Sequence, residues 1–176
     1  MKKKNIIILL NFLFLLWIVM IFYFSSQPPS VSNSQSGLVV KIIRTVNNIF
    51  DITDTKLFIK IESLLKDIWP FNKYKTPNAV VRKSAHFGIY FLLGMISSSF
   101  GYIYSKKTLI GILLGISLPV MIAVLDEFNQ GFVGRTSSLN DVIIDGAGAL
   151  TGTFVIMFSI LIIRIIKLLR RYFLKK

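Results

Sequence analysis

Residues 108–163 read TLIGILLGISLPVMIAVLDEFNQGFVGRTSSLNDVIIDGAGALTGTFVIMFSILII, and the fold prediction starts from this stretch. Two apolar runs, 108–125 and 139–163, flank a short polar segment. A helix rises about 1.5 Å per residue, so each run is long enough to cross the hydrocarbon core of a bilayer. Because Gly131 and Gly134 permit a tight reversal of the chain, the stretch predicts two membrane-spanning helices joined by a turn.

Two further apolar segments complete the predicted set of spans. Residues 6–24 follow three lysines, and residues 84–104 end just before Lys106 and Lys107. The first segment is too long for a signal peptide and has no small-residue cleavage site after it, so an uncleaved span is predicted. Of the 176 residues, 53% are hydrophobic, and the mean hydropathy is +0.66. The sequence therefore predicts an all-α integral membrane four-helix bundle in a single domain, 1–176.

The distribution of basic residues predicts how the spans are oriented. The chain has 21 Lys and Arg against 8 Asp and Glu, a formal net charge of +13. A nucleic-acid partner is the usual interpretation of such a charge, but the basic residues here flank apolar spans, as cytoplasmic anchors do. Eleven of them lie before residue 6, at 106–107 and in the tail 164–176, whereas the segment 126–138 contains only Arg135. The other nine lie in residues 25–83, which would be external, but long segments follow the rule poorly. We therefore expect a multi-pass plasma membrane protein with both termini cytoplasmic and no nucleic-acid partner.

Residues 25–83, between the first and second spans, are predicted to form an extracytoplasmic amphipathic helical insert. Apolar residues share one helical face within 38–50 and again within 57–68, opposite basic residues. Basic amphipathic helices of this kind tend to lie in the membrane interface. A small packed cap over the four spans is the alternative, and the two are compatible.

The segment between the last two spans and its flanks contain four of the chain's eight acidic residues. Asp126 and Glu127 end the apolar run, and Gln130 follows on the same side of a helix. The simpler interpretation is that these two carboxylates are solvated at the outer surface. A helix C-terminus, however, favours cations, so the pair is expected to need compensation from a base such as Arg135. Transfer of an ionisable group into the hydrocarbon region of a membrane costs at least about 2.5 kcal/mol, so ionisable residues in or beside the spans are candidates for function.

The fourth span carries the other two aspartates. Ser138-x-x-Asp141 has the form of a capping box, which is a sufficient structural role for Asp141. Asp145 lies one turn deeper, on the same helical face as Gly148 and Gly152. This small-residue stripe predicts that another helix packs closely beside Asp145, and Gly111-x-x-x-Gly115 in the third span has the same form.

Arg82, Lys83, His86 and Tyr90 open the second span at helical spacings of three and four residues. Arginine and lysine that reach to the interface, and tyrosine in the aromatic belt, are ordinary features of a span end. His86 lies a turn deeper, where a side chain that titrates near neutral pH is costly, so we favour a functional role for it.

Together these segments predict a polar pocket at the outer end of the bundle. A phosphate, a carboxylate or a lipid head group could bind the basic side chains, and His86 with a carboxylate could perform acid–base chemistry. No metal ligand set is assigned, although several oxygens at one point could also hold a divalent cation. The sequence assigns no particular cofactor and leaves that question open, and the absence of cysteine excludes thiol chemistry. The catalytic candidates are His86, Asp126, Glu127, Asp141 and Asp145, and the ligand-binding candidates are Arg82, Lys83, Tyr90, Gln130 and Arg135.

These residues also carry a resemblance to a known family. The chain resembles the VanZ-like bacterial membrane proteins over about Ile6 to Ile163, apart from the amphipathic insert. The matching pieces are Phe24-Ser25-Ser26-Gln27, Arg82-Lys83-x-x-His86-Phe87-x-x-Tyr90, Asp126-Glu127-x-x-Gln130-x-Phe132 leading to Arg135, and Asp141-x-x-x-Asp145-x-x-Gly148.

The resemblance implies a protein of the bacterial cell envelope, since the family's named member is associated with resistance to the glycopeptide antibiotic teicoplanin. It implies no catalytic mechanism. Three functions therefore remain open: a protein that binds an envelope lipid or the antibiotic, a membrane enzyme acting on a lipid-linked cell-wall intermediate, and a small transporter or flippase. The expected partners are membrane lipids and a lipid-linked precursor or glycopeptide, and a homo-oligomer is left open.

Overall fold

The computed structural model describes residues 3–50 and 76–174, and this part of the chain contains helices and no strand. The predicted all-α fold is confirmed. Four of the helices are long and apolar enough to cross a membrane. The helices are α1 (Lys3–Ser25), α2 (Pro29–Phe50), α4 (Pro77–Ser105), α5 (Thr108–Phe132) and α6 (Leu139–Phe173).

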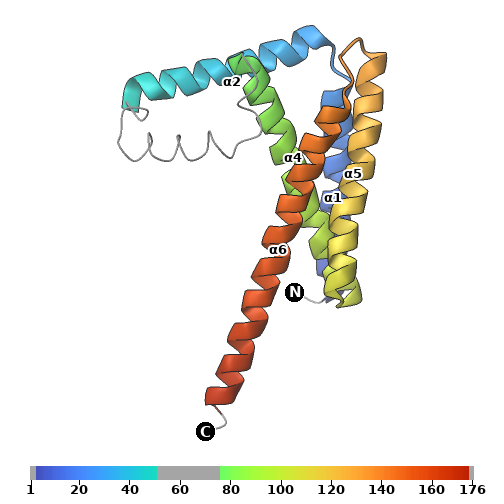
Figure 1. The fold of residues 1–176 in the computed structure, drawn as a ribbon, viewed down its shortest axis with the longest axis vertical. Helices are drawn as coiled ribbons and strands as arrows, with labels where there is room; N and C mark the ends of the chain where they lie inside the picture. The colour runs from blue at the N-terminus through green and yellow to red at the C-terminus, as the bar shows by residue number, and fades with distance from the viewer. Residues whose placement is uncertain (1–2, 51–75, 175–176) are drawn as a thin grey trace.

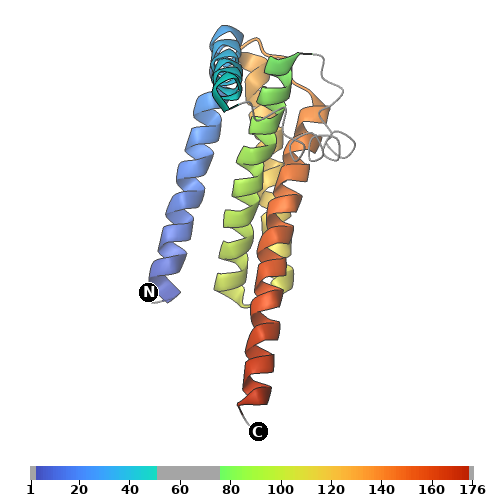
Figure 2. The same cartoon turned by 90° about the vertical axis from the view of Figure 1, so that its left-hand side faces the viewer.

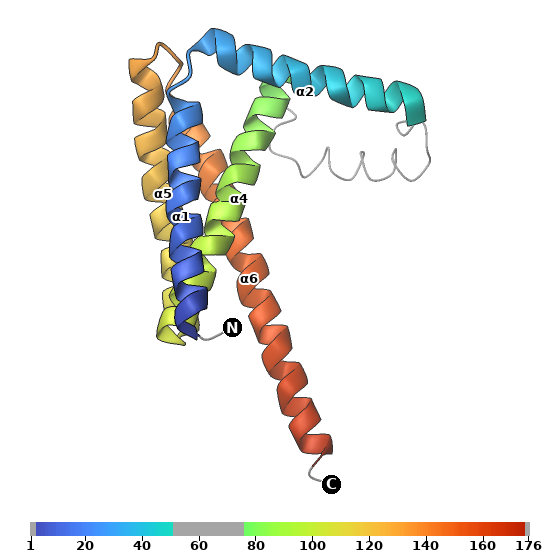
Figure 3. The same ribbon diagram turned by 180° about the vertical axis from the view of Figure 1, so that it is seen from behind.

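Helices α1, α4, α5 and α6 run side by side, and α2 leaves the bundle at one end and extends away from it (Figure 1). The view turned by 90° shows α1 on the outside of the bundle, beside α4 (Figure 2). From behind, the last part of α6 is seen to project beyond the other helices at the end opposite α2 (Figure 3). Side chains such as Phe12, Leu15 and Val19 of α1 are more than half exposed, as expected where lipid replaces water.

Several helices extend past the predicted span limits, and α6 continues to Phe173, ten residues beyond the predicted end at 163. Helix α4 begins at Pro77, seven residues before the predicted span, and the hydroxyl of Thr76 caps it by accepting a hydrogen bond from the Ala79 N–H. Helix α5 continues past the acidic pair to Phe132. Asp126 and Glu127 therefore lie inside the helix rather than in its last turn, so the helix dipole does not act on them as expected.

The closest packing in the bundle joins α4 to α6. A Cβ atom added to Gly148 would lie 2.3 Å from the carbonyl oxygen of Phe87, and one added to Gly152 would lie 2.0 Å from that of Phe91. Gly94 of α4 makes the reciprocal approach to Ala149. The predicted role of the glycine stripe is thereby confirmed, because only glycine allows the two backbones to come this close.

Helix α1 packs on α4 and α5 through apolar side chains such as Phe14, Ile18 and Ile21, and two hydrogen bonds to backbone carbonyls add to this contact. The indole N–H of Trp17 donates to the carbonyl of Ile89 at 2.9 Å, and the hydroxyl of Ser25 donates to the carbonyl of Asp126 at 3.2 Å. These bonds satisfy buried or half-buried polar groups that have no water to bind at membrane depth.

Helix α2 corresponds to the first amphipathic pattern of the predicted insert. Its apolar residues Leu38, Ile42 and Ile43 are each more than half exposed, which leaves an apolar face uncovered. The second pattern, within 57–68, lies outside the described residues.

We expect Gly152→Ala to destabilise the bundle by about 1–3 kcal/mol, because the added methyl group overlaps the Phe91 carbonyl of the facing helix. Gly88→Ala is the matched control, since no atom lies within 4 Å of its Cβ position and alanine favours a helix. The thermal midpoint of the detergent-solubilised variants measures this. Equal midpoints for the two variants would contradict the close α4–α6 contact.

Candidate functional site

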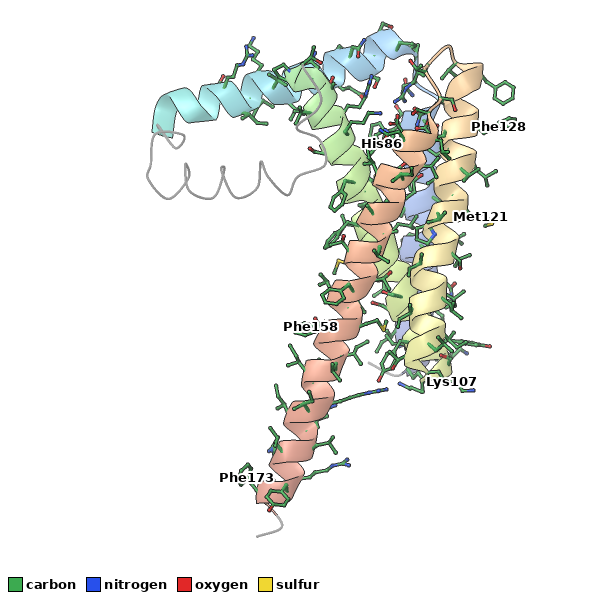
Figure 4. All side chains as sticks on the ribbon, in the orientation of Figure 1. His86, Lys107, Met121, Phe128, Phe158 and Phe173 are labelled. Carbon is green, nitrogen blue, oxygen red and sulfur yellow. The ribbon has the colours of Figure 1, made fainter. Side chains whose placement is uncertain are left out.

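The candidate site lies where α4, α5 and α6 meet, at the end of the bundle that carries the α5–α6 turn. Figure 4 shows His86 at this end and Lys107 at the opposite end. Asp126 of α5 is 2% exposed and accepts two hydrogen bonds. Tyr90 Oη donates to one carboxylate oxygen at 3.1 Å, and Gln130 Nε2 donates to the other at 3.2 Å. Asp126 is thus held in one orientation by side chains of two helices.

Asp145 of α6 is fully buried and lies beside His86 of α4. The Nδ1 atom of His86 is 3.4 Å from Asp145 Oδ1, at ion-pair distance if the imidazole is protonated. Neither oxygen of Asp145 accepts a hydrogen bond within the described part of the chain. A buried carboxylate without hydrogen bonds is costly, because nothing replaces the water it has lost.

The structure therefore brings three predicted site residues to one point. One ligand atom each from His86, Asp126 and Asp145 lie within 4.8 Å of one another, and the three residues come from three different helices.

Lys83 and Asp141 form a second polar pair. Lys83 Nζ makes a salt bridge with Asp141 Oδ2, and both side chains are about 10% exposed. Asp141 lies in the first turn of α6, where the helix dipole also favours a negative charge. The pair therefore joins the first turns of α4 to the start of α6.

Glu127 makes a structural contact that the sequence did not predict. Ser138 caps α6, since its hydroxyl accepts from the Asn140 N–H at 3.2 Å. In a capping box the Ser138 N–H would bond to Asp141, but here it donates to Glu127 Oε2 at 2.8 Å. The capping-box prediction is therefore right for Ser138 and wrong for Asp141. Glu127 therefore supports the α5–α6 turn through Oε2, while its Oε1 is buried without a hydrogen-bond partner among the described residues.

Three residues near the site were not singled out for it from the sequence. Asn129 Nδ2 donates to the hydroxyls of Ser25 and Ser26 at 3.0 and 3.1 Å. Ser25 is 2% exposed and itself bonds to the backbone of Asp126. The two serines belong to the segment Phe24–Gln27 that carries the resemblance, and this was their only signal.

A cavity of about 550 Å³ opens beside these residues, between α1, α2 and α4. One wall is apolar and includes Ile21, Leu38 and Ile89, while His86 and Asp126 lie at its polar end. A smaller cavity of about 180 Å³ reaches His86 from the α5–α6 turn. The arrangement is that of a pocket for a molecule with both an apolar and a polar part.

Two arginines lie at the polar end of the larger cavity. Arg82 and Arg135 both line it, and Arg135 Nη1 donates to the carbonyl of Phe24 at 3.5 Å. Burial and the positive charge of Arg82 lower the pKa of Arg135, and the carboxylates of Asp126, Glu127 and Asp141 offset only part of this. An anion bound between the two guanidinium groups would relieve this unfavourable environment.

The structure contradicts the simpler interpretation of three of these residues. Tyr90 is 1% exposed and bonded to Asp126, so it does not belong to an aromatic belt. Asp126 and Glu127 are 2% and 3% exposed, so they are not dissolved at a surface.

We expect Glu127→Leu to destabilise the protein by about 1–3 kcal/mol, because it leaves the Ser138 N–H without its partner. Glu127→Gln is the control, since its amide oxygen can still accept that bond. Thermal unfolding of both variants in detergent distinguishes them. A Gln variant as unstable as the Leu variant would show that the negative charge, not the hydrogen bond, supports the turn.

Comparison with known proteins identifies the family of the chain and confirms the resemblance seen in its sequence. A model of the family described as VanZ/LLP1 matches residues 10–164. This range includes the central part of each of the five described helices and every residue of the site. No curated protein and no solved structure matched the chain. Since the family model covers most of the sequence, the chain belongs to the VanZ/LLP1 family of membrane proteins.

Proposed function

We propose that this protein binds an envelope lipid with an anionic head group in the larger cavity, and that it lowers susceptibility to teicoplanin by doing so. The observation that carries the proposal is the pairing of an apolar wall with two arginines at one end of the cavity. Acyl chains would lie against Ile21, Leu38 and Ile89, and the head group would meet Arg82 and Arg135.

The arrangement of charges supports placing this cavity at the outer leaflet. Lys3 Nζ bonds to the carbonyl of Tyr104, so the start of α1 lies beside the α4–α5 turn with its two lysines. Arg164 of α6 bonds to Tyr102 and Thr108 at the same level. The cavity is at the other end of the bundle (Figure 4). Because basic residues favour the cytoplasmic side, both termini are proposed to be cytoplasmic and the cavity external.

The uncovered face of α2 supports the same placement. Leu38 and Val39 line the cavity, while Ile42 and Ile43 further along the helix are exposed, and the helix extends away from the bundle beside the cavity (Figure 1). A helix of this kind at the membrane interface would place the cavity entrance at the depth of the lipid head groups.

Lipid binding tests the proposal directly. We expect the double variant Arg82→Gln/Arg135→Gln to bind anionic lipid about tenfold more weakly or worse, because each charge-assisted hydrogen bond contributes about 1.5–3 kcal/mol. The measurement is titration of phosphatidylglycerol into the purified protein, read by native mass spectrometry, with phosphatidylcholine as the neutral comparison. Lys106→Gln/Lys107→Gln removes the same charge at the far end of the bundle and should bind as the wild type does. Equal losses in both double variants would show a general charge effect and contradict the pocket.

The resistance part of the proposal is tested in cells. We expect wild-type protein to raise the inhibitory concentration of teicoplanin for a sensitive bacterium, and Arg82→Gln/Arg135→Gln to give no protection at matched membrane abundance. Lys106→Gln/Lys107→Gln should protect. No protection by the wild type would reject the role in resistance while leaving lipid binding to be judged by titration.

An enzyme acting on a lipid-linked cell-wall intermediate is the second candidate. It is favoured by the His86–Asp145 pair, 3.4 Å apart with the imidazole at the cavity, an arrangement suited to acid–base chemistry. An enzyme would convert such a lipid into product when incubated with it, whereas a binding protein would return it unchanged.

A further inference from the structure

The most unusual feature of the site is that the carboxylate of Asp145 is buried without a hydrogen bond from the described residues, and the cavity and its arginines do not explain this. The Asp145 carboxylate is fully buried, and neither oxygen accepts a hydrogen bond within the described residues. Both oxygens would normally bind several donors, and a carboxylate at this depth needs positive charge beside it. His86 alone supplies at most one such charge, at 3.4 Å and without hydrogen-bond geometry.

We propose that His86, Asp126 and Asp145 form a site for one divalent transition-metal ion, for which zinc is the first candidate. One ligand atom from each residue lies within 4.8 Å of the others. Two ligand atoms about 2.1 Å from a tetrahedral ion are about 3.4 Å apart. His86 Nδ1 and Asp145 Oδ1 already have this separation, and small side-chain rotations would bring Asp126 to the same ion.

The surroundings of Asp126 fit a ligand. Tyr90 and Gln130 each donate to one of its oxygens, which fixes the carboxylate plane while leaving a lone pair on each oxygen. Hydrogen bonds of this kind from neighbouring side chains orient metal ligands in many sites. The nearby acids are engaged elsewhere, since Asp141 pairs with Lys83 and Glu127 accepts from Ser138.

The donor set indicates the class of ion. One imidazole nitrogen with carboxylate oxygens suits zinc or manganese, whereas calcium and magnesium prefer sets made of oxygen alone. His86 and Asp126 also line the larger cavity, so an ion could enter from there and would keep an open coordination position toward it. Binding of the ion does not require that the cavity holds a lipid.

The test is metal binding by the full-length protein, purified in detergent through a tag without histidine and stripped with chelator. We expect about one equivalent of zinc per chain, measured by isothermal titration with zinc chloride and by elemental analysis. Because the ion would join three helices, saturating zinc should raise the thermal midpoint by about 5 °C or more.

Asp145→Asn and His86→Phe nearly keep the shapes of the side chains. Each should weaken zinc binding about 100-fold or more, because loss of a residue that only hydrogen-bonds to a metal ligand already costs about 10–100-fold in affinity. Both variants should also lose the increase in thermal midpoint. Thr153→Val is the matched control, because it removes another buried polar atom without a partner on the same helix and leaves the three ligands intact.

Cobalt supplies an independent readout, since strong visible d–d absorption indicates a four-coordinate site in the protein, and this absorption should be lost in His86→Phe. Arg82→Gln/Arg135→Gln should still bind zinc, so failure of lipid binding and failure of metal binding are separable. The proposal is overturned if the wild type binds neither zinc nor cobalt, or if Asp145→Asn and His86→Phe bind them as the control does.

Discussion

The contact between the backbones of α4 and α6 is the constraint on which the rest of the site depends. Gly148 and Gly152 let α6 approach the carbonyls of Phe87 and Phe91 more closely than any side chain would permit. His86 precedes Phe87 in α4, and Asp145 lies one turn before Gly148 in α6. The separation of the imidazole from the carboxylate is therefore set by the same approach that holds the helices together. In a bilayer, where burial of apolar surface contributes little, such close packing supplies much of the attraction between helices.

The four acidic residues of the site have four different environments, although they are close in sequence. Asp126 is oriented by Tyr90 and Gln130, and Asp141 is neutralised by Lys83. Glu127 receives the backbone N–H of Ser138 and so supports the turn. Asp145 is left with His86 beside it and accepts no hydrogen bond from residues 3–50 or 76–174. Asp126 and Asp141 thus have hydrogen-bond donors or a cation beside them, and Glu127 has one satisfied oxygen and one, Oε1, that is buried without a partner in the described part of the chain. Asp145 has neither oxygen satisfied there, so its carboxylate needs a further positive charge.

The two ends of the bundle differ in a way that links the fold to the proposed function. One end gathers Lys3, the α4–α5 turn and Arg164, and it has the composition of a cytoplasmic anchor. The other end combines the cavity, the two arginines and the exposed apolar face of α2. A lipid head group arriving at that interface would meet the guanidinium groups first and the buried His86 and Asp126 behind them.

The sequence alone determined the helical class, the four apolar helices and the glycine stripe, because these depend on local composition and on helical periodicity within one segment. It also singled out the acidic residues and His86, since an ionisable group in an apolar segment is costly whatever the tertiary arrangement of the helices. The tertiary structure decided the partners. The conformation of the α5–α6 turn decides that Glu127, and not Asp141, accepts the Ser138 N–H. The docking of α1 decides that Asn129 bonds to Ser25 and Ser26. These contacts join residues on different helices, and periodicity within one helix cannot specify which residue of a neighbouring helix will face it.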